Sequence, residues 1–361
     1  MRLFILLLVF IFALTFSINA ELKVHFIDVG QGDSILIQED NTTNILIDGG
    51  NRWNSVEDKV VGYLRNNNVD TIDALIATHA HADHIGSLEA VINNFKVEQI
   101  YDSGKIHTSK TYENYLLAVD KNDIPFNTPR RGDILSIDDL EFKVLHPTNP
   151  VEKYNLNSSS IVLHLNYGEV SFLFTGDIEK EVERDIINSN LNIKSTILKT
   201  PHHGSKTSSS DNFIAEVSPE VAVITVGEDN KFDHPSPETI SLFQKRNIAI
   251  YRTDMNEDIV IISDGKGYSI ETDQKHEQKT VENPAEISEV KESKPVNENL
   301  LNINTTNAAK LDVLWGVGPA TAEKIIKYRE NNNGFKSIEE IKNVNGIDEK
   351  KFNKWKNEIT I

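Results

Sequence analysis

The segment THAHADHIG, which begins at Thr78, constrains the fold of this chain more than any other feature of the sequence. It places His79, His81, Asp83 and His84 within one short stretch. These side chains cannot all face one way, because side chains repeat about every 3.6 residues on a helix and every 2 on a strand. On a loop they can converge on two neighbouring metal ions. Imidazole and carboxylate are ligands of zinc, and they suit manganese when water fills the remaining positions.

The sequence around this cluster predicts where it lies in the fold. Residues 72–78 are mostly apolar and predict a short buried strand before the cluster. Other apolar runs also end in side chains that can bind a metal or support a ligand. These are FIDVGQGDS (26–34), ILIDGG (45–50), FLFTGD (172–177) and KTPHHGS (199–205), and DHPSP (233–237) stands just before an expected helix. Open α/β sheets assemble sites at strand ends, so the pattern predicts one site shared by distant segments.

Composition limits the chemistry available to this site. The chain has 361 residues and no cysteine. Disulfide bonds, a thiol nucleophile and a zinc–thiolate site are therefore excluded, and any metal must be bound by His, Asp or Glu. The length allows one large domain and a smaller one.

Residues 1–20 have the composition of a secretory signal peptide. Arg2 precedes an apolar run from Leu3 to Phe16, and Ala20 offers a small residue at the cleavage site. A retained N-terminal anchor is the alternative. No later segment approaches the length of a membrane span, so we expect no integral span after cleavage. The sequence thus predicts a protein that is secreted or displayed on the extracytoplasmic surface.

Three further segments follow residue 20. Residues 21–270 alternate β-rich and helical runs, which predicts a layered α/β domain. Residues 271–299 are polar and lack aromatic side chains, which is typical of a flexible acidic linker. Residues 300–361 recover apolar periodicity, with helices expected at 308–314, 320–331, 337–341 and 349–359 between glycine-containing turns. This pattern predicts a compact all-α module.

The motifs of residues 21–270 occur in the order found in the metallo-β-lactamase superfamily. The chain resembles this superfamily from about Lys23 to Ile270, and more closely the soluble hydrolase domain of the ComEC competence proteins. The matching segments are FIDVGQGDS, THAHADHIG, FTGD, HHGS and HPSP. The resemblance implies an αββα sandwich with a binuclear site for two divalent ions, zinc or manganese, at one edge.

The resemblance also implies which side chains hold the two ions. His79 and His81 would bind one metal, Asp83 and His84 the other, and Asp177 would bridge them. Either His202 or His203 would complete the second site. Many superfamily members have a further histidine ligand for the first metal, for which the candidates in this chain are His107, His146 and His164. ComEC-like members carry Asn and Ser in that region, as Asn157, Ser158 and Ser159 do here, so water can complete the first metal's shell.

Other residues are expected to act on the substrate or on the ligands. Asp83 can orient the nucleophile, and His234 can contact the phosphate or protonate the leaving oxygen. The metal-binding loop is expected to be supported from behind by Asp28, Gln31, Asp33 and Asp48.

The C-terminal segment resembles the helix-hairpin-helix module of the ComEA competence DNA receptors over residues 300–361. The resemblance rests on LNINTTNA (301–308) and LWGVGPA (314–320). Glycines let such a hairpin approach a DNA phosphate closely, and the contacts ignore sequence. The predicted DNA-binding residues are Gly316, Val317, Gly318, Ala320, Lys324 and Lys327. Asp348 stands where the second hairpin of related modules usually has glycine, so we expect that half only to pack.

Together these features predict a secreted, metal-dependent phosphodiesterase or nuclease acting on DNA, linked to competence or to the use of extracellular DNA. The net charge is −18, and the excess of acidic residues lies in the body and the linker, not in the tail. A tail that binds DNA would therefore hold the polymer near a repulsive surface. The alternatives are a hydrolase of another phosphodiester, such as a cell-wall polymer or lipid headgroup, and a surface DNA-binding protein with a weakly active metal domain.

Overall fold

The computed structural model describes residues 21–40, 42–228, 230–273, 301–304, 306, 311, 319–332, 334–347, 349–356 and 359–360. The chain divides into two compact units, one up to Gln278 and one from Lys279. The predicted signal peptide and residues 274–299 of the predicted linker lie outside the described residues, whereas residues 271 and 272, predicted as linker, end a strand of the first unit. The two units are described separately below.

The first unit contains two large sheets. The first sheet has the strand order β17-β16-β1-β2-β3-β5-β7-β8. Its strands are β1 (Leu22–Phe26), β2 (Ile35–Glu39), β3 (Thr43–Ile47), β5 (Ala74–Ala77), β7 (Ile100–Asp102), β8 (Phe126–Asn127), β16 (Ile259–Ser263) and β17 (Tyr268–Thr272). The pairs from β17 to β3 are antiparallel, whereas β3, β5, β7 and β8 run parallel.

The second sheet has the order β15-β14-β13-β12-β11-β10-β9. Its strands are β9 (Ile134–Ile137), β10 (Leu140–His146), β11 (Val162–Tyr167), β12 (Val170–Phe174), β13 (Ile197–Lys199), β14 (Val221–Ile224) and β15 (Ala249–Arg252). The strands from β12 to β15 run parallel. A separate short parallel pair joins β4 (Thr71–Ile72) and β6 (Lys96–Val97).

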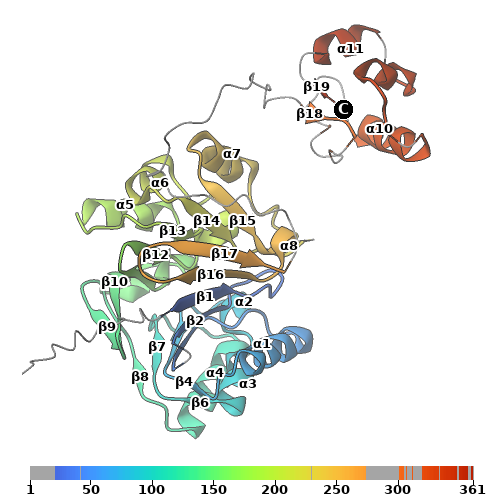
Figure 1. Ribbon diagram of the computed structural model, residues 1–361. Coiled ribbons are helices and arrows are strands. Elements are labelled where there is room, and N and C mark those ends of the chain that lie inside the picture. Colours follow the sequence, from blue (N-terminus) through green and yellow to red (C-terminus); the bar gives the residue numbers. More distant parts are fainter. Residues whose placement is uncertain are drawn as a thin grey trace, which may run out of the picture. The chain divides into compact units, whose positions relative to one another are not determined.

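Helices cover the outer faces of both sheets. In Figure 1, α1, α3 and α4 lie together beside the first sheet, and α5, α6 and α7 lie beside the second. The helices are α1 (Asn54–Asn66), α2 (Ala82–Ile85), α3 (Leu88–Asn94), α4 (Lys110–Lys121), α5 (Lys180–Asn188), α6 (Asp211–Val217), α7 (Pro237–Lys245) and α8 (Thr253–Asn256), with short 3₁₀ turns η1 (Val151–Lys153), η2 (Asn157–Ser159) and η3 (Pro201–Gly204).

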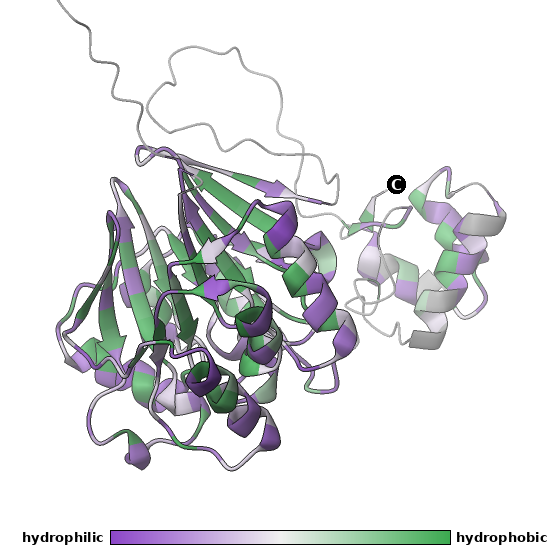
Figure 2. Ribbon diagram, turned by 90° about the horizontal axis from the view of Figure 1, so that it is seen from below, coloured by the Kyte–Doolittle hydropathy of each residue, from purple (hydrophilic) through white to green (hydrophobic). Residues whose placement is uncertain are grey.

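Three apolar clusters hold these layers together. On β2, Ile35 and Ile37 pack into the cluster between the sheets, whereas Leu36 packs into the cluster under α1, α3 and α4. A third cluster lies between the second sheet and α5, α6 and α7. Because the strands are buried on both faces, their sequences read as nearly continuous apolar runs. Figure 2 shows the apolar colour concentrated on the strands of this unit. The αββα sandwich expected from the motifs is confirmed.

The C-terminal unit is a small helical module with one added strand pair. Among its described residues the helices include α10 (Pro319–Asn331), η4 (Ile338–Asn343) and α11 (Glu349–Trp355), and Trp355 is fully buried in its core. The expectation of an all-α module with a helix to Ile359 is wrong at this end. The helix stops at Trp355, and β19 (Ile359–Thr360) pairs in parallel with β18 (Leu301–Asn302). A β-branched residue at 359 and another at 360 favour that extended pairing.

Within the described ranges, no helix combines the length and the apolar composition that crossing a membrane requires.

Candidate metal centre

The predicted ligands come from three loops that follow strands of both sheets. The segment with His79 to His84 follows β5 of the first sheet, Asp177 follows β12 of the second, and His202 and His203 follow β13. Each strand ends at the same edge of the sandwich, so its polar loop reaches a common point. The prediction that distant strand ends meet in one place therefore holds for these residues.

One group of ligand atoms contains Asp83, His84 and His203. Their ligand atoms lie within 4.8 Å of one another. His203 Nε2 lies 3.8 Å from Asp83 Oδ2 and 3.5 Å from Asp177 Oδ2. His84 Nε2 lies 3.3 Å from Asp177 Oδ2. Of the two histidines that the sequence left open for the second site, the structure thus places His203 beside Asp83 and His84.

A second group shares His84 with the first. His79, His84 and Asp177 also have ligand atoms within 4.8 Å of one another. His79 Nε2 lies 3.0 Å from His81 Nδ1 and 3.9 Å from Asp177 Oδ2. The Asp177 carboxylate thus lies near both His79 and His203, and its role as a bridging ligand stays a prediction.

His202 takes a different position from His203. Its Nε2 lies 3.9 Å from Asp177 Oδ2 and 3.3 Å from Asn157 Nδ2. Both histidines have positive φ angles, 50° for His202 and 52° for His203. Such a backbone costs non-glycine residues of order 1–3 kcal/mol, and here it directs the two adjacent rings to different neighbours. His202 therefore lies on the Asn157 side of Asp177.

The described atoms of this cluster fit divalent cations. His84 Nε2, His203 Nε2 and Asp177 Oδ1 are buried and have no hydrogen-bond partner among the described residues. Leaving a buried polar atom unsatisfied costs about 1–3 kcal/mol. Burial would raise the pKa of Asp177, yet His203 and His84 beside it hold that pKa well below its usual range. A charged carboxylate facing unpaired imidazole nitrogens is a suitable donor set for metal ions that prefer nitrogen and oxygen ligands.

Asp48 orients His84 from behind. Its Oδ2 lies 2.8 Å from His84 Nδ1 and accepts the hydroxyl of Thr78 at 2.6 Å, and its Oδ1 accepts the Thr78 amide at 2.8 Å. All three groups are buried. A hydrogen bond at Nδ1 fixes the ring and its tautomer, which leaves Nε2 free to face the cluster. The geometry agrees with the supporting role predicted for Asp48.

Asp33 supports the other side through residues that sequence reasoning missed. Its Oδ2 pairs with Lys199 Nζ at 2.7 Å, and its Oδ1 accepts the hydroxyl of Thr225. The same Oδ1 lies 3.4 Å from His203 Nδ1, which contacts the Thr225 carbonyl at 2.8 Å. Lys199 is 1 % exposed. The only sequence signal for Lys199 was its place three residues before His202 at the end of an apolar run.

Two predicted supporting residues lie in different surroundings. Asp28 accepts the amide of Gly30 at 3.0 Å and pairs with Lys59 at 3.3 Å. Within the described part of the chain, its carboxylate makes no hydrogen bond or ion pair with a predicted ligand. Gln31 Oε1 lies 3.5 Å from the Gly227 amide, so Gln31 touches the loop that leads to His234. Asp28 thus shapes the turn instead of supporting the ligands.

Three histidines are candidates for a further ligand of the first metal. His146 Nε2 contacts the Ser158 carbonyl at 2.8 Å, and His164 Nε2 contacts the Lys194 carbonyl at 3.0 Å, so both are core residues. His107 Nδ1 is buried without a hydrogen-bond partner among the described residues, so a ligand role for His107 stays a prediction. Ser160 was not predicted. Its hydroxyl lies 3.2 Å from His79 Nδ1 and accepts the Asp177 amide at 3.0 Å.

His234 lies at the rim of the cluster. Its ring centroid is 5.6 Å from that of His202. Burial, with His203 and His202 nearby, lowers the pKa of His234 to about 4. A neutral imidazole at this place can accept a proton or hydrogen-bond to a substrate. The substrate contact of His234 stays a prediction.

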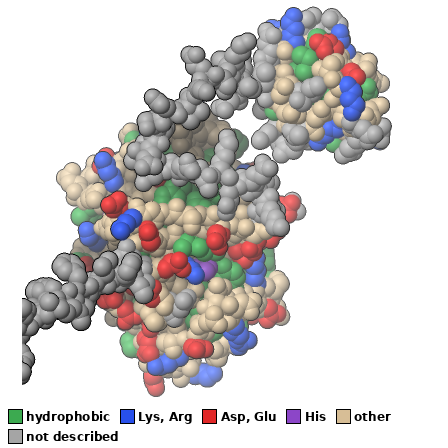
Figure 3. Space-filling view, in the orientation of Figure 1, with side chains coloured by type: hydrophobic (Ala, Val, Ile, Leu, Met, Phe, Trp, Pro, Cys, Tyr) green, Lys and Arg blue, Asp and Glu red, His purple; other side chains and the backbone are tan. Residues whose placement is uncertain are grey.

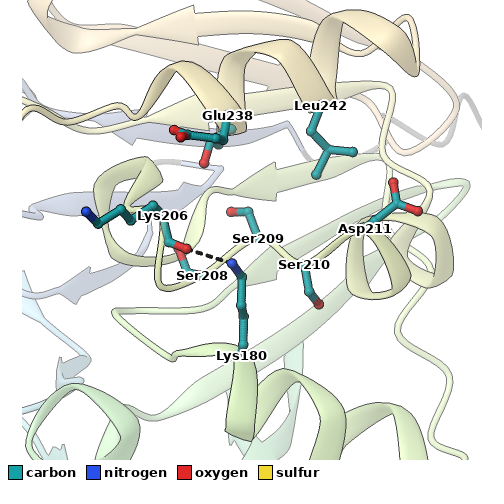
Figure 4. A pocket seen from close by; sticks show the side chains of 9 residues that line it. Lys180, Lys206, Ser208, Ser209, Ser210, Asp211, Glu238 and Leu242 are labelled. Atoms are coloured by element: carbon teal, nitrogen blue, oxygen red, sulfur yellow. Dashed lines mark hydrogen bonds between the residues drawn. The ribbon is translucent and has the colours of Figure 1, made fainter.

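The pocket in Figure 4 is separate from this cluster. It has a volume of about 330 Å³ and lies between the start of α5, the loop after η3 and α7. Its lining includes Lys180, whose Nζ donates to the Lys206 carbonyl at 2.6 Å, together with Lys206 and Glu238. None of the predicted metal ligands lines it. Figure 3 shows many Asp and Glu side chains on the visible face of the first unit.

Comparison with known proteins agrees with this geometry. Residues 27–228 match the family described as the metallo-beta-lactamase superfamily. The chain belongs to the metallo-β-lactamase superfamily. Residues 296–360 match the helix-hairpin-helix motif. The protein therefore joins a metallo-hydrolase domain to a DNA-binding type of motif.

The curated relatives cover these two parts separately. Over 254 residues the chain is 35 % identical to ComE operon protein 3 of Bacillus subtilis, covering 66 % of this chain and 33 % of that protein. Over 62 residues it is 52 % identical to ComE operon protein 1 of the same organism, covering 17 % of this chain and 30 % of that protein. The chain thus spans about a third of the length of either relative. A metallo hydrolase structure from Ignicoccus hospitalis aligns with a TM-score of 0.44 at 16 % identity, covering 66 % of this chain and 98 % of that one.

The predicted DNA-binding residues are only partly described. Gly316, Val317 and Gly318 lie outside the described residues, and Ala320 is described only as part of the α10 backbone. Lys324 and Lys327 are exposed on α10. They stay predicted DNA contacts, and they lie on the helix that follows the expected hairpin.

Proposed function

We propose that this protein is a secreted, metal-dependent phosphodiesterase that hydrolyses DNA, with the C-terminal unit holding the polymer. The observation that carries the proposal is two groups of ligand atoms that share His84, with Asp177 of one group 3.5 Å from His203 of the other, in a chain that also has a helix-hairpin-helix motif. His79, His81 and Asp177 would hold one ion, and Asp83, His84, His203 and Asp177 the other. Relatives named for competence make the use of DNA from outside the cell a fitting role.

Two divalent ions in this cluster would lower the pKa of water and offset the negative charge that grows on a phosphoryl oxygen. Residues of the chain itself would accept the proton of the attacking water and contact the phosphate. Asp83 presents a carboxylate that is only partly buried and can accept a proton from attacking water. The rings of His234 and His202 lie next to each other, and the N–H group of a neutral imidazole there can donate a hydrogen bond to a phosphate oxygen.

The rest of the proposal concerns place and substrate delivery. The N-terminal residues support export, because they combine Arg2, an apolar run and Ala20. The acidic first unit repels DNA, whereas a DNA-holding tail on a tether raises the local concentration of substrate. Sequence-independent phosphate contacts suit a scavenging or processing nuclease.

The test is cleavage of linear and circular DNA by the mature protein with added Mn²⁺ or Zn²⁺. A His79→Ala, Asp83→Ala double variant is the loss-of-ligand comparison, and Asp28→Ala is the matched control outside the ligand groups. We expect metal-dependent cleavage by the wild type and the control only. Absence of cleavage together with hydrolysis of a cell-wall polymer or lipid diester would replace DNA by that substrate. Detection of the protein in the cytoplasm alone would overturn secretion.

A further inference from the structure

The loop between β14 and α7 holds an exposed aromatic ring beside the ligand cluster. Phe232 in this loop is 57 % exposed. The side chain of Asn230 fixes the loop from within. Its Nδ2 donates to the carbonyls of Gly227 at 2.9 Å and His234 at 2.7 Å, and its Oδ1 accepts the amides of Phe232 at 3.2 Å and His234 at 3.0 Å. Phe232 is therefore exposed on an internally braced loop.

The same loop is attached to the turn that carries the histidine ligands. The Ser236 amide donates to the Gly204 carbonyl at 2.9 Å. A Cβ on Gly204 would come within 2.7 Å of Pro235 Cβ, so the two segments touch closely. Gly204 directly follows His203. The position of Phe232 is thus fixed relative to the metal ligands.

A line of rings leads from Phe232 to the candidate bridging ligand. The Phe232 and His234 rings are stacked, with centroids 5.8 Å apart and planes inclined by 28°. The His234 ring meets the His202 ring edge-on at 5.6 Å and 75°. His202 Nε2 lies 3.9 Å from Asp177 Oδ2. The His234 ring consequently stands between Phe232 and His202, the side chain that contacts Asp177.

Exposed single apolar residues are common and need no explanation by themselves. Other large apolar side chains are also exposed in the described part of the chain, among them Trp53, Ile106 and Ile134. Within that part, Phe232 alone of these exposed residues has a ring contact with a predicted site residue. Its exposed ring therefore lies next to the candidate site.

We propose that Phe232 is a stacking platform for a nucleobase next to the scissile phosphodiester, and that it gives the enzyme a preference for single-stranded or unpaired DNA. This inference rests on the proposed function. A flat aromatic ring is the chemical counterpart of a base face, and stacking tolerates any sequence. A base inside a duplex has both faces covered by its neighbours, so only an unstacked base can use the platform. Base–aromatic contacts change affinity by about five- to a hundredfold.

The first experiment measures kcat and KM of the mature full-length protein on a short single-stranded oligonucleotide. It compares wild type, Phe232→Ala, Phe232→Trp and the matched control Ile134→Ala, which removes an equally exposed apolar side chain on β9. We expect Phe232→Ala to raise KM five- to a hundredfold with a smaller change in kcat. Phe232→Trp and Ile134→Ala should stay near wild type. On an oligonucleotide whose residue next to the cleaved bond is abasic, wild type and Phe232→Ala should have the same KM.

A second experiment detects stacking without turnover. A 2-aminopurine base next to the cleavage position loses fluorescence when it stacks, and the signal is read in an Asp83→Ala background. Quenching that disappears in the Asp83→Ala, Phe232→Ala double variant supports the platform. DNA cleavage with equal KM for wild type and Phe232→Ala, or equal losses in Phe232→Ala and Phe232→Trp, overturns it while leaving the nuclease intact. No cleavage of any DNA by wild type overturns the proposed function itself.

Discussion

At the residue scale, the candidate centre contains buried groups of opposite charge behind its histidines. Asp33 and Asp48 stand behind His203 and His84, and Lys199 is the buried cation that pairs with Asp33. Burial would raise the pKa of Asp33, but the Lys199 ammonium group holds it below its ordinary value. Burial raises the pKa of Asp48. The supporting carboxylates thus have different environments although both stand behind a histidine.

Replacing Lys199 by Met should destabilise the first unit strongly. The change leaves the Asp33 carboxylate buried without its cation, and breaking a buried ion pair in this way costs roughly 3–5 kcal/mol. Urea unfolding of the metal-free protein measures the free energy of unfolding. Lys206→Met, at an exposed lysine on the following loop, should change it by about 0.5 kcal/mol or less. A loss below about 1 kcal/mol in Lys199→Met would show that the pair contributes little.

Asp102, at the end of β7, predicts a pH dependence of stability. Burial raises its pKa to about 6, although its carboxylate accepts the Gly104 amide at 2.6 Å. The folded state favours the protonated form of Asp102. Above pH 6, ionisation of Asp102 therefore lowers the free energy of unfolding by about 3 kcal/mol. Asp102→Asn should therefore be more stable than wild type by up to that amount at pH 7.5. The difference should shrink as the pH falls from about 6 to about 4.

The measurement is the free energy of unfolding of both proteins between pH 4 and pH 8 without metal. Asp70→Asn, at an exposed position, is the control and should keep a constant difference from wild type. A pH-independent difference for Asp102→Asn would contradict the raised pKa.

At the element scale, short connections between strands and helices place the ligands. The turn after β5 leads within a few residues into α2, and Gly86 directly follows the last residue of α2. Gly86 lies against the backbone of residues 51 and 52. The amide of Gly86 donates to the Gly50 carbonyl at 2.9 Å, and that of Gly49 donates to the His84 carbonyl at 2.6 Å. The backbones of these two loops are thus in direct contact beneath the ligands. This contact leaves no room for a side chain at Gly86.

Gly86→Ala should disturb this packing more than an ordinary glycine replacement. A Cβ there would lie 2.2 Å from the Arg52 amide nitrogen and 2.4 Å from the Ala82 carbonyl oxygen, so backbone must move. We expect a loss of stability of about 1–3 kcal/mol and weaker Mn²⁺ binding, measured by unfolding and by calorimetry. Gly62→Ala, in α1 with nothing within 4 Å, should gain about 0.5–1 kcal/mol. Equal effects of both changes would refute the packing argument.

At the scale of the whole molecule, two compact units have separate apolar cores. The first core lies between two sheets, and the second gathers around Trp355. Neither core needs residues of the other. Catalysis and polymer binding can therefore be carried out by separate units of this chain.

Deletion of residues 279–361, which keeps β17 and the whole first unit, should separate these activities. We expect the remaining unit to keep turnover on a small phosphodiester but to lose affinity for long DNA and most of its salt dependence. The slope of log affinity against log salt concentration reports released counterions, so it should fall towards zero. Full-length protein with Lys324→Ala and Lys327→Ala should lose about one unit of slope per contact removed. An unchanged slope after deletion would place DNA binding in the first unit.

Much of this architecture could be predicted from local sequence. The strand-then-ligand order of THAHADHIG, FTGD and HHGS predicted the residues that meet, because polar side chains directly after apolar runs can only lie at a sheet edge. Absence of cysteine fixed the donor types. The end of the last helix was predicted wrongly, because pairing of Ile359 and Thr360 with β18 depends on a partner far away in sequence.

The sequence by itself determined the two-part organisation, the sandwich and the set of candidate ligand side chains. Tertiary structure alone decided that His203, and not His202, stands beside Asp83, since adjacent residues in a positive-φ turn point in directions that no local pattern encodes. It likewise decided that Asp28 shapes a turn, that Lys199 neutralises Asp33 and that Phe232 stacks on His234. These outcomes depend on distances between strands and loops remote in sequence, which only the packed chain brings together.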